Sequence, residues 1–338
     1  MNRLSSGQLP PSLTDRFGRR HTDLRVSVTD RCNLRCGYCM PLEVTFKPQD
    51  EILTYEEITR VVAVATRLGI RTVRLTGGEP LVRAEVDRLV RSLMAIPRLE
   101  EVALTTNGLL LAEQADRLAR AGLTRLNVSL DSLAPERFQA IARRPGLDRV
   151  LAGLTQARRC GFRSIRINAV SVRGLTEREI VPLARFCRDE SYHLRFIEFM
   201  PLDAEAGWTN DTVLTGATVR QLLESTFGPL APVQGGDPGQ PAVDYDYADG
   251  CGRVGFINPV SQPFCDRCDR LRLTADGQFR NCLFSTAEWD ARQVIRSGGD
   301  DHNLAQLLVD CVAAKEAAHG IGTSQFQRPD RAMYQIGG

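Results

Sequence analysis

The chain has almost no lysine, and its charges are nearly balanced. Lys47 and Lys315 are the only lysines among 43 basic residues, so arginine carries nearly all of the positive charge. The formal net charge of +2 is too small to indicate binding to nucleic acid or to a membrane surface. A base-composition bias in the source genome explains most of the arginines, although an arginine in a pocket binds phosphate well through paired hydrogen bonds.

Long apolar runs are also missing. Residues 1–20 contain no apolar core of a signal peptide, and no segment approaches the length of a membrane span. We therefore expect a cytoplasmic chain. Its ten cysteines are then expected to be reduced thiols or metal ligands rather than disulfides.

Three cysteines with metal-ligand spacing lie near the N-terminus. Cys32, Cys36 and Cys39 form a C-x3-C-x2-C motif, and the next cysteine and histidine along the chain are Cys160 and His193. A structural zinc site and an ordinary cubane cluster each take four protein ligands. The motif therefore favours a [4Fe–4S] cluster in which one iron is left open to bind a further ligand.

A second set of three cysteines occurs in the C-terminal third. Cys265, Cys268 and Cys282 again offer three thiolates. From spacing alone, a zinc site that borrows Cys251 and an iron–sulfur cluster are equally good interpretations. The first motif favours iron–sulfur for the second set as well. The other cysteines, including Cys187 on an apolar helical stripe, are expected to be inert.

Strand-like and helix-like segments alternate between about residues 23 and 200. Thr54-x-x-Glu57 and Thr176-x-x-Glu179 are predicted to be capping boxes, and an apolar stripe from Val86 to Leu93 predicts a further helix. Such alternation predicts a parallel sheet with right-handed crossovers. The strand-like runs are 24–29, 72–76, 102–106, 125–130, 164–172 and 194–200.

Each predicted strand has one apolar side and one polar side, whereas buried parallel strands are usually apolar on both. Because helices must cover the apolar sides, the polar sides are expected to face an interior cavity. In the last strand, Ile197 and Phe199 are assigned to the helix side, and Glu198 and Met200 to the cavity. The pattern predicts a wide, incomplete barrel around a polar ligand, with a half-exposed sheet as the alternative.

The composition and the pattern of predicted elements change after Met200. Residues 228–241 are rich in glycine and proline and are predicted to form a loop, while 244–257 and 269–282 look β-like, with Asp276-Gly277 as a hairpin turn. We expect three parts. These are an N-terminal segment at 1–22, a partial barrel at 23–228 and a smaller C-terminal region at 229–338 that carries the second cysteine set.

Several motifs together resemble a known family. The first cysteine motif, with Tyr38 beside Cys39 and Gly77-Gly78-Glu79-Pro80 one βα unit later, resembles the radical S-adenosylmethionine (SAM) superfamily. The likeness narrows to its GTP 3′,8-cyclase family, which acts in molybdenum cofactor biosynthesis, and it extends from about Arg19 to the C-terminus. The segments that carry it are 29–33, 74–81, 105–108, 127–131, 195–200 and the terminal Gly337-Gly338.

This resemblance implies an α/β fold, an incomplete (βα)6 TIM-like barrel followed by a C-terminal α+β region with a second iron–sulfur cluster. It implies two [4Fe–4S] clusters and SAM as cofactors. A 5′-deoxyadenosyl radical made from SAM would convert GTP to 3′,8-cyclo-7,8-dihydro-GTP. The implied partners are GTP, a flavodoxin- or ferredoxin-like reductant, the downstream cyclic pyranopterin monophosphate synthase and a second copy of the chain in a homodimer.

The resemblance also implies roles for individual residues. The catalytic cysteines, which would hold the SAM-binding cluster, are Cys32, Cys36 and Cys39, and the SAM contacts are Tyr38, Gly78, Ser129 and Met200. The second cluster, whose open iron would take the guanine base, would be held by Cys265, Cys268 and Cys282. The substrate contacts are Arg25, Arg74, Thr105, Arg166, Arg270, Leu271 and Arg272. Many family members carry lysine in place of Arg166, which keeps the charge but changes the hydrogen-bond geometry.

Two alternatives belong to other functional classes. A radical SAM enzyme that matures peptides commonly carries more C-terminal cysteines, and Arg270-Leu271-Arg272 and the Gly337-Gly338 end favour GTP. A non-catalytic zinc-binding module would leave Gly77-Gly78-Glu79-Pro80 unexplained. For the Gly–Gly end, the resemblance implies a tail that reaches into the site, and a frayed terminus is the alternative.

Overall fold

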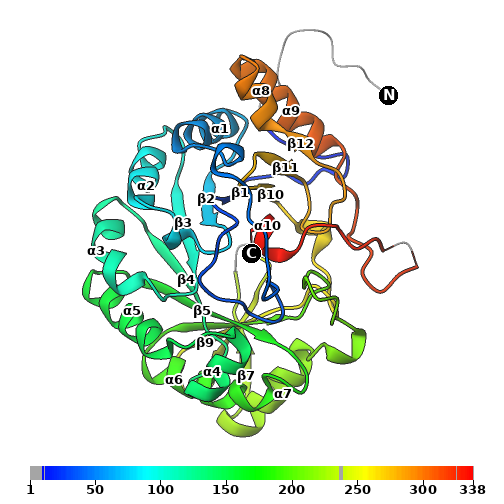
Figure 1. The fold of residues 1–338 in the computed structure, drawn as a ribbon. Coiled ribbons are helices and arrows are strands. Elements are labelled where there is room, and N and C mark those ends of the chain that lie inside the picture. The colour runs from blue at the N-terminus through cyan, green and yellow to red at the C-terminus, as the bar shows by residue number, and fades with distance from the viewer. Residues whose placement is uncertain (1–9, 11, 236–238, 325, 338) are drawn as a thin grey trace.

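The structure is a computed structural model that describes residues 10, 12–235, 239–324 and 326–337. Six parallel strands form its central part, and helices cover their outer side (Figure 1). These strands are β1 (Asp23–Ser27), β2 (Thr72–Thr76), β3 (Glu101–Thr106), β4 (Arg125–Ser129), β5 (Ser164–Ser171) and β6 (His193–Glu198). The covering helices are α1 (Tyr55–Arg67), α2 (Val86–Met94), α3 (Leu111–Arg120), α4 (Pro135–Ala142), α5 (Leu147–Arg159), α6 (Ile180–Asp189) and α7 (Gly216–Phe227). This arrangement confirms the predicted α/β barrel-like fold.

The alternation of apolar and polar residues sorts the strands into two faces. Leu24, Val26, Val73 and Leu75 are fully buried in the main core, whereas Arg25 and its neighbours on the other face line a cavity. The expected interior polar face is therefore present, and the half-exposed sheet is not. The apolar residues of the other face belong to the main hydrophobic core, together with residues of the covering helices.

The last strand, β6, differs only in part from the expectation: Glu198 and Met200 line the cavity as expected, but Ile197 and Phe199 line it as well. Leu194 and Phe196 belong to the core, and Arg195 and Ile197 line the cavity. The assignment of Ile197 to the helix side was wrong because strand and turn were treated as one run. The strand ends at Glu198, so Met200 reaches the cavity from the following loop and not from the strand.

One predicted helix start is confirmed and the other is wrong. Thr54 and Glu57 form the reciprocal capping box that begins α1. Thr176 makes no cap; its hydroxyl instead donates to the Val170 carbonyl oxygen at 3.0 Å and accepts from the Val172 amide at 2.8 Å. The Glu179 carboxylate is turned to Ser132 Oγ at 2.7 Å, so α6 begins only at Ile180.

The C-terminal third extends the same sheet at both of its edges. The order is β12-β11-β10-β1-β2-β3-β4-β5-β6-β9-β8-β7, with β10 parallel to β1 and β9 parallel to β6. The added strands are β7 (Leu230–Pro232), β8 (Val243–Tyr247), β9 (Arg253–Ile257), β10 (Arg270–Leu273), β11 (Gln278–Arg280) and β12 (Trp289–Asp290). The expected Asp276-Gly277 turn connects β10 to β11.

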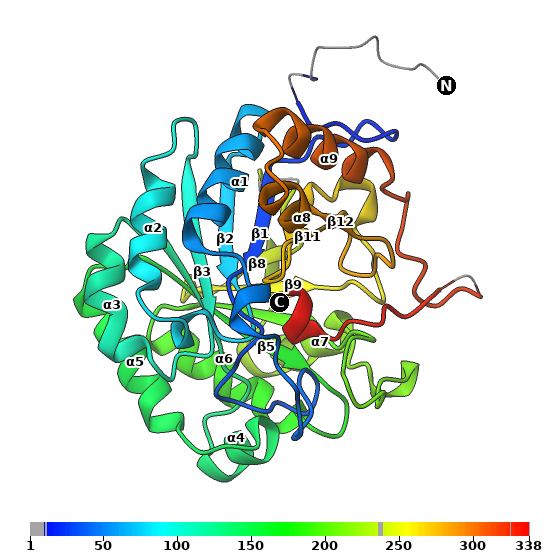
Figure 2. The same cartoon turned by 45° about the horizontal axis from the view of Figure 1, so that its top comes forward.

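The end of the chain returns to the middle of the barrel. Helices α8 (Ala291–Arg296) and α9 (Asp301–Ala313) lie beside α1, and the short helix α10 (Met333–Ile336) lies over the barrel centre next to the loop that follows β1 (Figures 1 and 2). Met40 from that loop packs with Ala332 and Tyr334. In the described part of the chain, no helix is both long enough and apolar enough to span a membrane.

A buried carboxylate ties β6 to two other segments. Glu198 is 1% exposed. Its oxygens accept hydrogen bonds from the amides of Gly216, Val260 and Ser261 at 2.9–3.1 Å and from the Ser261 hydroxyl at 2.5 Å. The carboxylate thereby holds the start of α7 and the loop after β9 against the end of β6.

Replacing Glu198 by Gln is expected to lower the free energy of unfolding by about 3 kcal/mol, because an amide nitrogen would then face backbone donors. Glu113→Gln is the matched control: this carboxylate is 67% exposed and pairs with Arg149, so its loss is expected to cost no more than about 0.5 kcal/mol. Denaturant unfolding measures both. Equal stability of the two variants would contradict the role of Glu198.

Candidate active site

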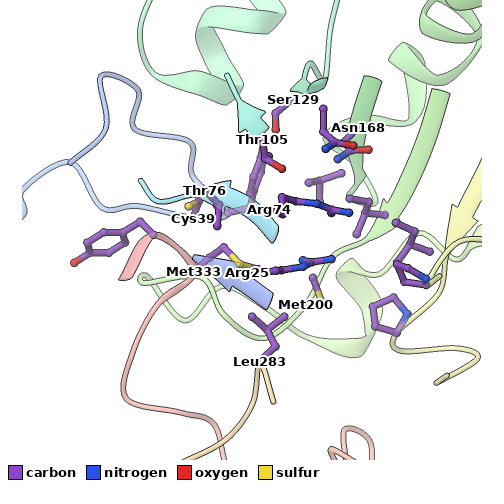
Figure 3. Close-up of a pocket in the computed structure, with 18 of the residues that line it drawn as sticks. Arg25, Cys39, Arg74, Thr76, Thr105, Ser129, Asn168, Met200, Leu283 and Met333 are labelled. Carbon is purple, nitrogen blue, oxygen red and sulfur yellow. The ribbon is translucent and has the colours of Figure 1, made fainter. Parts of the chain in front are cut away.

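Both cysteine sets open into one cavity at the mouth of the barrel. The wall of this cavity is built from the ends of strands β1–β6, the C-terminal strand β10 and the tail (Figure 3). Its lining includes Cys32, Cys36, Cys39, Cys265, Cys268 and Cys282. The two motifs are more than 220 residues apart in sequence, and they meet because β10 pairs directly with β1.

The first cysteine set lies on a loop that is pressed against the end of β2. The Gly78 amide donates to the Thr29 carbonyl oxygen at 2.8 Å, and the Glu79 amide donates to that of Arg31 at 2.8 Å. A Cβ atom on Gly78 would lie 2.5 Å from the Arg31 oxygen and 2.6 Å from the Asp30 oxygen. Glycine is therefore required here for the close approach of two backbones.

Glu79 secures the same junction from the β3 side. Its carboxylate accepts from the Leu81 amide at 3.0 Å, from Thr106 Oγ1 at 2.7 Å and from the Asn107 amide at 2.6 Å. Burial raises the pKa of Glu79 to about 7. Through its hydrogen bonds, the Glu79 carboxylate fixes the loops that follow β2 and β3.

The thiols of the first set are poor acids in the absence of a metal. Burial raises the pKa of Cys32 to about 11 and of Cys39 to about 12, and it also raises that of Cys36. A metal displaces such protons when it binds, so these thiols become thiolates only with a cluster in place.

The second set lies in a more positive environment. Burial alone would raise the pKa of Cys268, but the charges of Arg270 and Lys315 outweigh it and lower this pKa to about 7. The Arg270 Nη2 atom is 3.3 Å from Cys268 Sγ. Cys251, the candidate fourth ligand of a zinc site, is exposed in the turn between β8 and β9 and does not line the cavity.

Each set supplies three thiols to the cavity, and Cys251 lies apart from the second set. Iron–sulfur clusters are held by cysteine thiolates, so the donor chemistry of both sets fits such clusters.

Three arginines cross the cavity wall in one row. Arg25 on β1 is in register with Arg272 on β10 and with Arg74 on β2, and Figure 3 shows Arg25 and Arg74 extending in the same direction. Burial, followed by repulsion from neighbouring arginines, lowers the pKa of Arg25. Burial and Arg270 lower the pKa of Arg272 to about 9. None of the three forms an ion pair with a carboxylate of the described residues; the charge of Asp23 offsets part of that on Arg25 and Arg74, and the row keeps a net positive charge.

Most of the other expected contacts line the same cavity. Tyr38, Gly78, Thr105, Ser129, Met200 and Arg270 all do so. Two expected substrate contacts do not. The Leu271 side chain is fully buried in the main core, on the face opposite to Arg270 and Arg272, and Arg166 is not among the lining residues although its strand face is the interior one.

Comparison with known proteins agrees with this geometry. The chain matches the family model described as Radical SAM superfamily over residues 26–187 and the one described as Molybdenum Cofactor Synthesis C over 192–321. It is 50% identical over 333 residues to the GTP 3′,8-cyclase of Rhodopirellula baltica, covering 97% of this chain and 93% of that protein. It is 45% identical over 334 residues to the one of Mycolicibacterium smegmatis, with 96% and 92% covered.

The chain belongs to the GTP 3′,8-cyclase family. It is accordingly a radical SAM enzyme of molybdenum cofactor biosynthesis, with SAM and two [4Fe–4S] clusters as its cofactors. Among solved structures, Streptococcus suis SuiB bound to S-adenosylmethionine has the same fold, with a TM-score of 0.63 at 16% identity, covering 86% of this chain and 68% of that one.

The structure adds several residues to this GTP 3′,8-cyclase site that sequence reasoning missed. Arg195 lines the cavity and donates to Gln240 Oε1 at 2.8 Å, and Asn168 lies opposite Ser129 in register. Asn107 donates to Asn33 Oδ1 at 2.7 Å and lies 3.7 Å from Cys32 Sγ. The alternation of apolar and polar residues in β5 already predicted that Asn168 faces the cavity. Arg195 was missed because its face of β6, which also carries Ile197, was assigned to the helix side.

The tail of this family member also enters the site. Arg272 Nη1 donates to the Gly337 carbonyl oxygen, and Gly337 has a φ of +87°, with the position of a Cβ only 2.9 Å from Thr76 Cγ2. Met333 and Tyr334 line the cavity beside it. Gly337 is thus not frayed, while its expected companion Gly338 lies outside the described residues.

Gly78→Ala is expected to displace the first cysteine loop, because its Cβ would overlap two backbone oxygens. Iron bound after anaerobic reconstitution should fall from about eight toward about four per chain, as expected when one of two cubanes is lost. The control is Gly207→Ala, whose new Cβ would meet its nearest neighbour at 3.6 Å. Full iron content and unchanged SAM affinity in Gly78→Ala would refute the close-approach argument.

Proposed function

We propose that this chain converts GTP to 3′,8-cyclo-7,8-dihydro-GTP inside the cavity that both cysteine sets share. The observation that carries the proposal is the placement of six cysteines and an unpaired arginine row around one space. A nucleoside triphosphate matches that space, since its phosphates supply the negative charge that the arginines lack.

We assign the cofactor contacts as follows. Cys32, Cys36 and Cys39 hold one cluster, and Cys265, Cys268 and Cys282 hold the other. When bound, the first cluster and SAM supply a 5′-deoxyadenosyl radical, which is the chemistry that the protein itself lacks. The SAM contacts are Tyr38, Gly78, Ser129 and Met200, all of which reach the cavity.

Tyr38 has a defined orientation for this role. Its hydroxyl donates to Asp131 Oδ2 at 2.5 Å, and the other Asp131 oxygen accepts from the Val170 amide at 2.8 Å. This chain of contacts connects the first cysteine loop to the ends of β4 and β5. Tyr38 therefore keeps its ring beside Cys36 and Cys39 before any ligand arrives, which reduces the ordering cost of binding.

We assign the triphosphate to Arg25, Arg74 and Arg272, with Arg270, Thr105, Arg166 and Arg195 as further polar contacts of the substrate. Arg166 keeps its assignment because it shares the interior face of β5 with Asn168. Leu271 contributes by keeping Arg270 and Arg272 on the cavity face, since strand residues alternate. Several guanidinium groups in a buried site fix a polyanion in both position and orientation.

The tail closes the site. Met333 and Tyr334 cover the cavity next to Cys39, and the Gly337 carbonyl accepts from Arg272. Enclosure of this kind excludes water and protects a reactive species from side reactions.

The remaining assignments extend beyond the site. We propose a flavodoxin- or ferredoxin-like protein as electron donor, cyclic pyranopterin monophosphate synthase as the next enzyme, and a homodimer in the cytoplasm. We retain the division into an N-terminal segment at 1–22, a radical SAM partial barrel at 23–228 and a second-cluster region at 229–338. Residues 1–9, 11, 236–238, 325 and 338 of these parts lie outside the described residues.

The activity is tested by incubating anaerobic holoprotein with SAM, dithionite and GTP and measuring 5′-deoxyadenosine and GTP consumption. We expect 5′-deoxyadenosine to form only when GTP is present, in an amount equal to the GTP consumed. ATP, the matched control nucleotide, should not replace GTP. A protein that contains zinc, or that cleaves SAM only when a peptide is added, would contradict the proposal.

Arg25→Met is expected to raise the dissociation constant for GTP about 10- to 100-fold, the loss of one charge-assisted hydrogen-bonding group. Iron content should not change. Arg163→Met is the control, because Arg163 is exposed in the loop before β5 and does not line the cavity. Equal GTP affinities of the two variants would exclude Arg25 from the substrate site.

Removal of Gly337 and Gly338 is expected to abolish cyclisation and to leave iron content intact, because Arg272 loses its tail contact while both cysteine sets stay in place. Gly337→Ala should reproduce most of the loss, since its Cβ would approach Thr76 and its backbone has a positive φ. The assay is product formation beside an iron determination. Normal turnover by the trimmed chain would refute the role of the tail.

A further inference from the structure

Lys315 is a buried lysine in a chain that otherwise uses arginine. It is 3% exposed, and it follows the last turn of α9, where its amide donates to the Val312 carbonyl at 3.0 Å. The chain's other lysine, Lys47, has a side chain that is 41% exposed and pairs with Glu51. Lys315 is therefore the one lysine whose charge is removed from solvent.

Within the described residues, the three hydrogen-bond contacts of the Lys315 ammonium all belong to the second cysteine region. Its Nζ atom donates to the Asn281 carbonyl oxygen at 2.6 Å and to the Arg270 carbonyl oxygen at 2.9 Å, and it lies 3.8 Å from Cys268 Sγ. These three contacts use the three N–H groups of an ammonium. They connect the start of β10, the residue before Cys282 and the sulfur of Cys268.

No Asp or Glu of the described residues forms an ion pair with Lys315, although its charge is buried. Such a charge is costly unless a negative group compensates it. The negative group that the geometry offers is the Cys268 thiolate, together with whatever this thiolate ligates. Arg270 Nη2 approaches the same sulfur at 3.3 Å, but Arg270 also lines the cavity, whereas Lys315 lies behind the sulfur and does not.

A second contact fixes the same region independently of charge. Asn281 donates through Nδ2 to the Cys311 carbonyl oxygen of α9 at 2.9 Å, while its own carbonyl accepts from Lys315. The residue next to Cys282 is thereby held between α9 and Lys315. The helix end, the lysine and two of the three cysteines form one connected unit.

We propose that Lys315 is a positioning residue that sets the electronic state of the second cluster, its fixed positive charge behind Cys268 Sγ raising the reduction potential of that cluster. The inference rests on the proposed function for the assignment of a cluster to Cys265, Cys268 and Cys282. A positive charge and a hydrogen bond at a ligating sulfur both stabilise the reduced, more negative form. A stabilised reduced form means a more positive potential.

The shape of the site explains why lysine occurs here. Its ammonium points three donors at two carbonyl oxygens and a sulfur that surround it, whereas a planar guanidinium would project its donors in one plane. Arginine at this position would keep the charge but lose part of the contact set. Methionine would keep the approximate length of the side chain and remove the charge.

The test compares the holoenzymes of Lys315→Met, Lys315→Arg and the control Lys47→Met with the unaltered enzyme. Iron and sulfide are counted, and a redox titration follows the electron paramagnetic resonance signal that addition of SAM leaves unchanged. Lys315→Met is expected to shift the midpoint potential of this signal to a more negative value. Lys315→Arg should stay nearer to the unaltered enzyme, and Lys47→Met should not differ from it.

Each outcome decides the inference. An unchanged midpoint in Lys315→Met with the full iron content overturns it. If Lys315→Met loses the second cluster, retention of that cluster by Lys315→Arg supports the role of the charge, and loss from both variants overturns it in favour of simple packing. Absence of an iron–sulfur cluster at Cys265, Cys268 and Cys282 in the unaltered enzyme would instead refute the proposed function.

Discussion

The parallel pairing of β10 with β1 is the interaction on which the site depends. It joins a strand from the last quarter of the chain to the first strand of the barrel, with Arg272 in register with Arg25. Because β10 follows Cys265 and Cys268 directly, the pairing brings the second cysteine set to the cavity that the first set already lines. It also completes the arginine row. One strand pairing thus brings the second cysteine set beside the first and places Arg272 beside Arg25.

Much of this architecture follows from preferences of residues that lie close together in the sequence. Periodicity located all six barrel strands to within about two residues, because each alternates between a helix-covered side and a cavity side. The Thr54 capping box and the Asp276-Gly277 turn have the local structure that their residues favour. The two cysteine sets, Arg25, Arg74, Thr105 and Ser129 all reach the cavity as expected. The strand periodicity, the capping box and the turn depend on neighbours within a few positions, whereas the second cysteine set reaches the cavity only through the pairing of β10 with β1.

The features that sequence analysis missed depend on contacts between residues that are far apart in the sequence. Thr176 makes no helix cap because backbone groups of Val170 and Val172 use its hydroxyl. Ile197 was wrongly assigned to the helix side: it lines the cavity with Arg195, whereas Leu194 and Phe196 on the other face of β6 pack in the core. That error hid Arg195. Leu271 was grouped with its arginine neighbours by motif, but alternation along β10 turns it into the core. The contacts of Lys315 combine segments that no sequence window contains.

The central claim is that both clusters and GTP share one cavity. It is tested most directly by titrating GTP and SAM, in separate calorimetric experiments, into anaerobic chains in which Cys265, Cys268 and Cys282 are all replaced by alanine. The account predicts that GTP affinity falls at least about tenfold, which is roughly 1.4 kcal/mol, while SAM affinity stays near that of the unaltered enzyme. Equally tight GTP binding in the absence of the second cluster would contradict it.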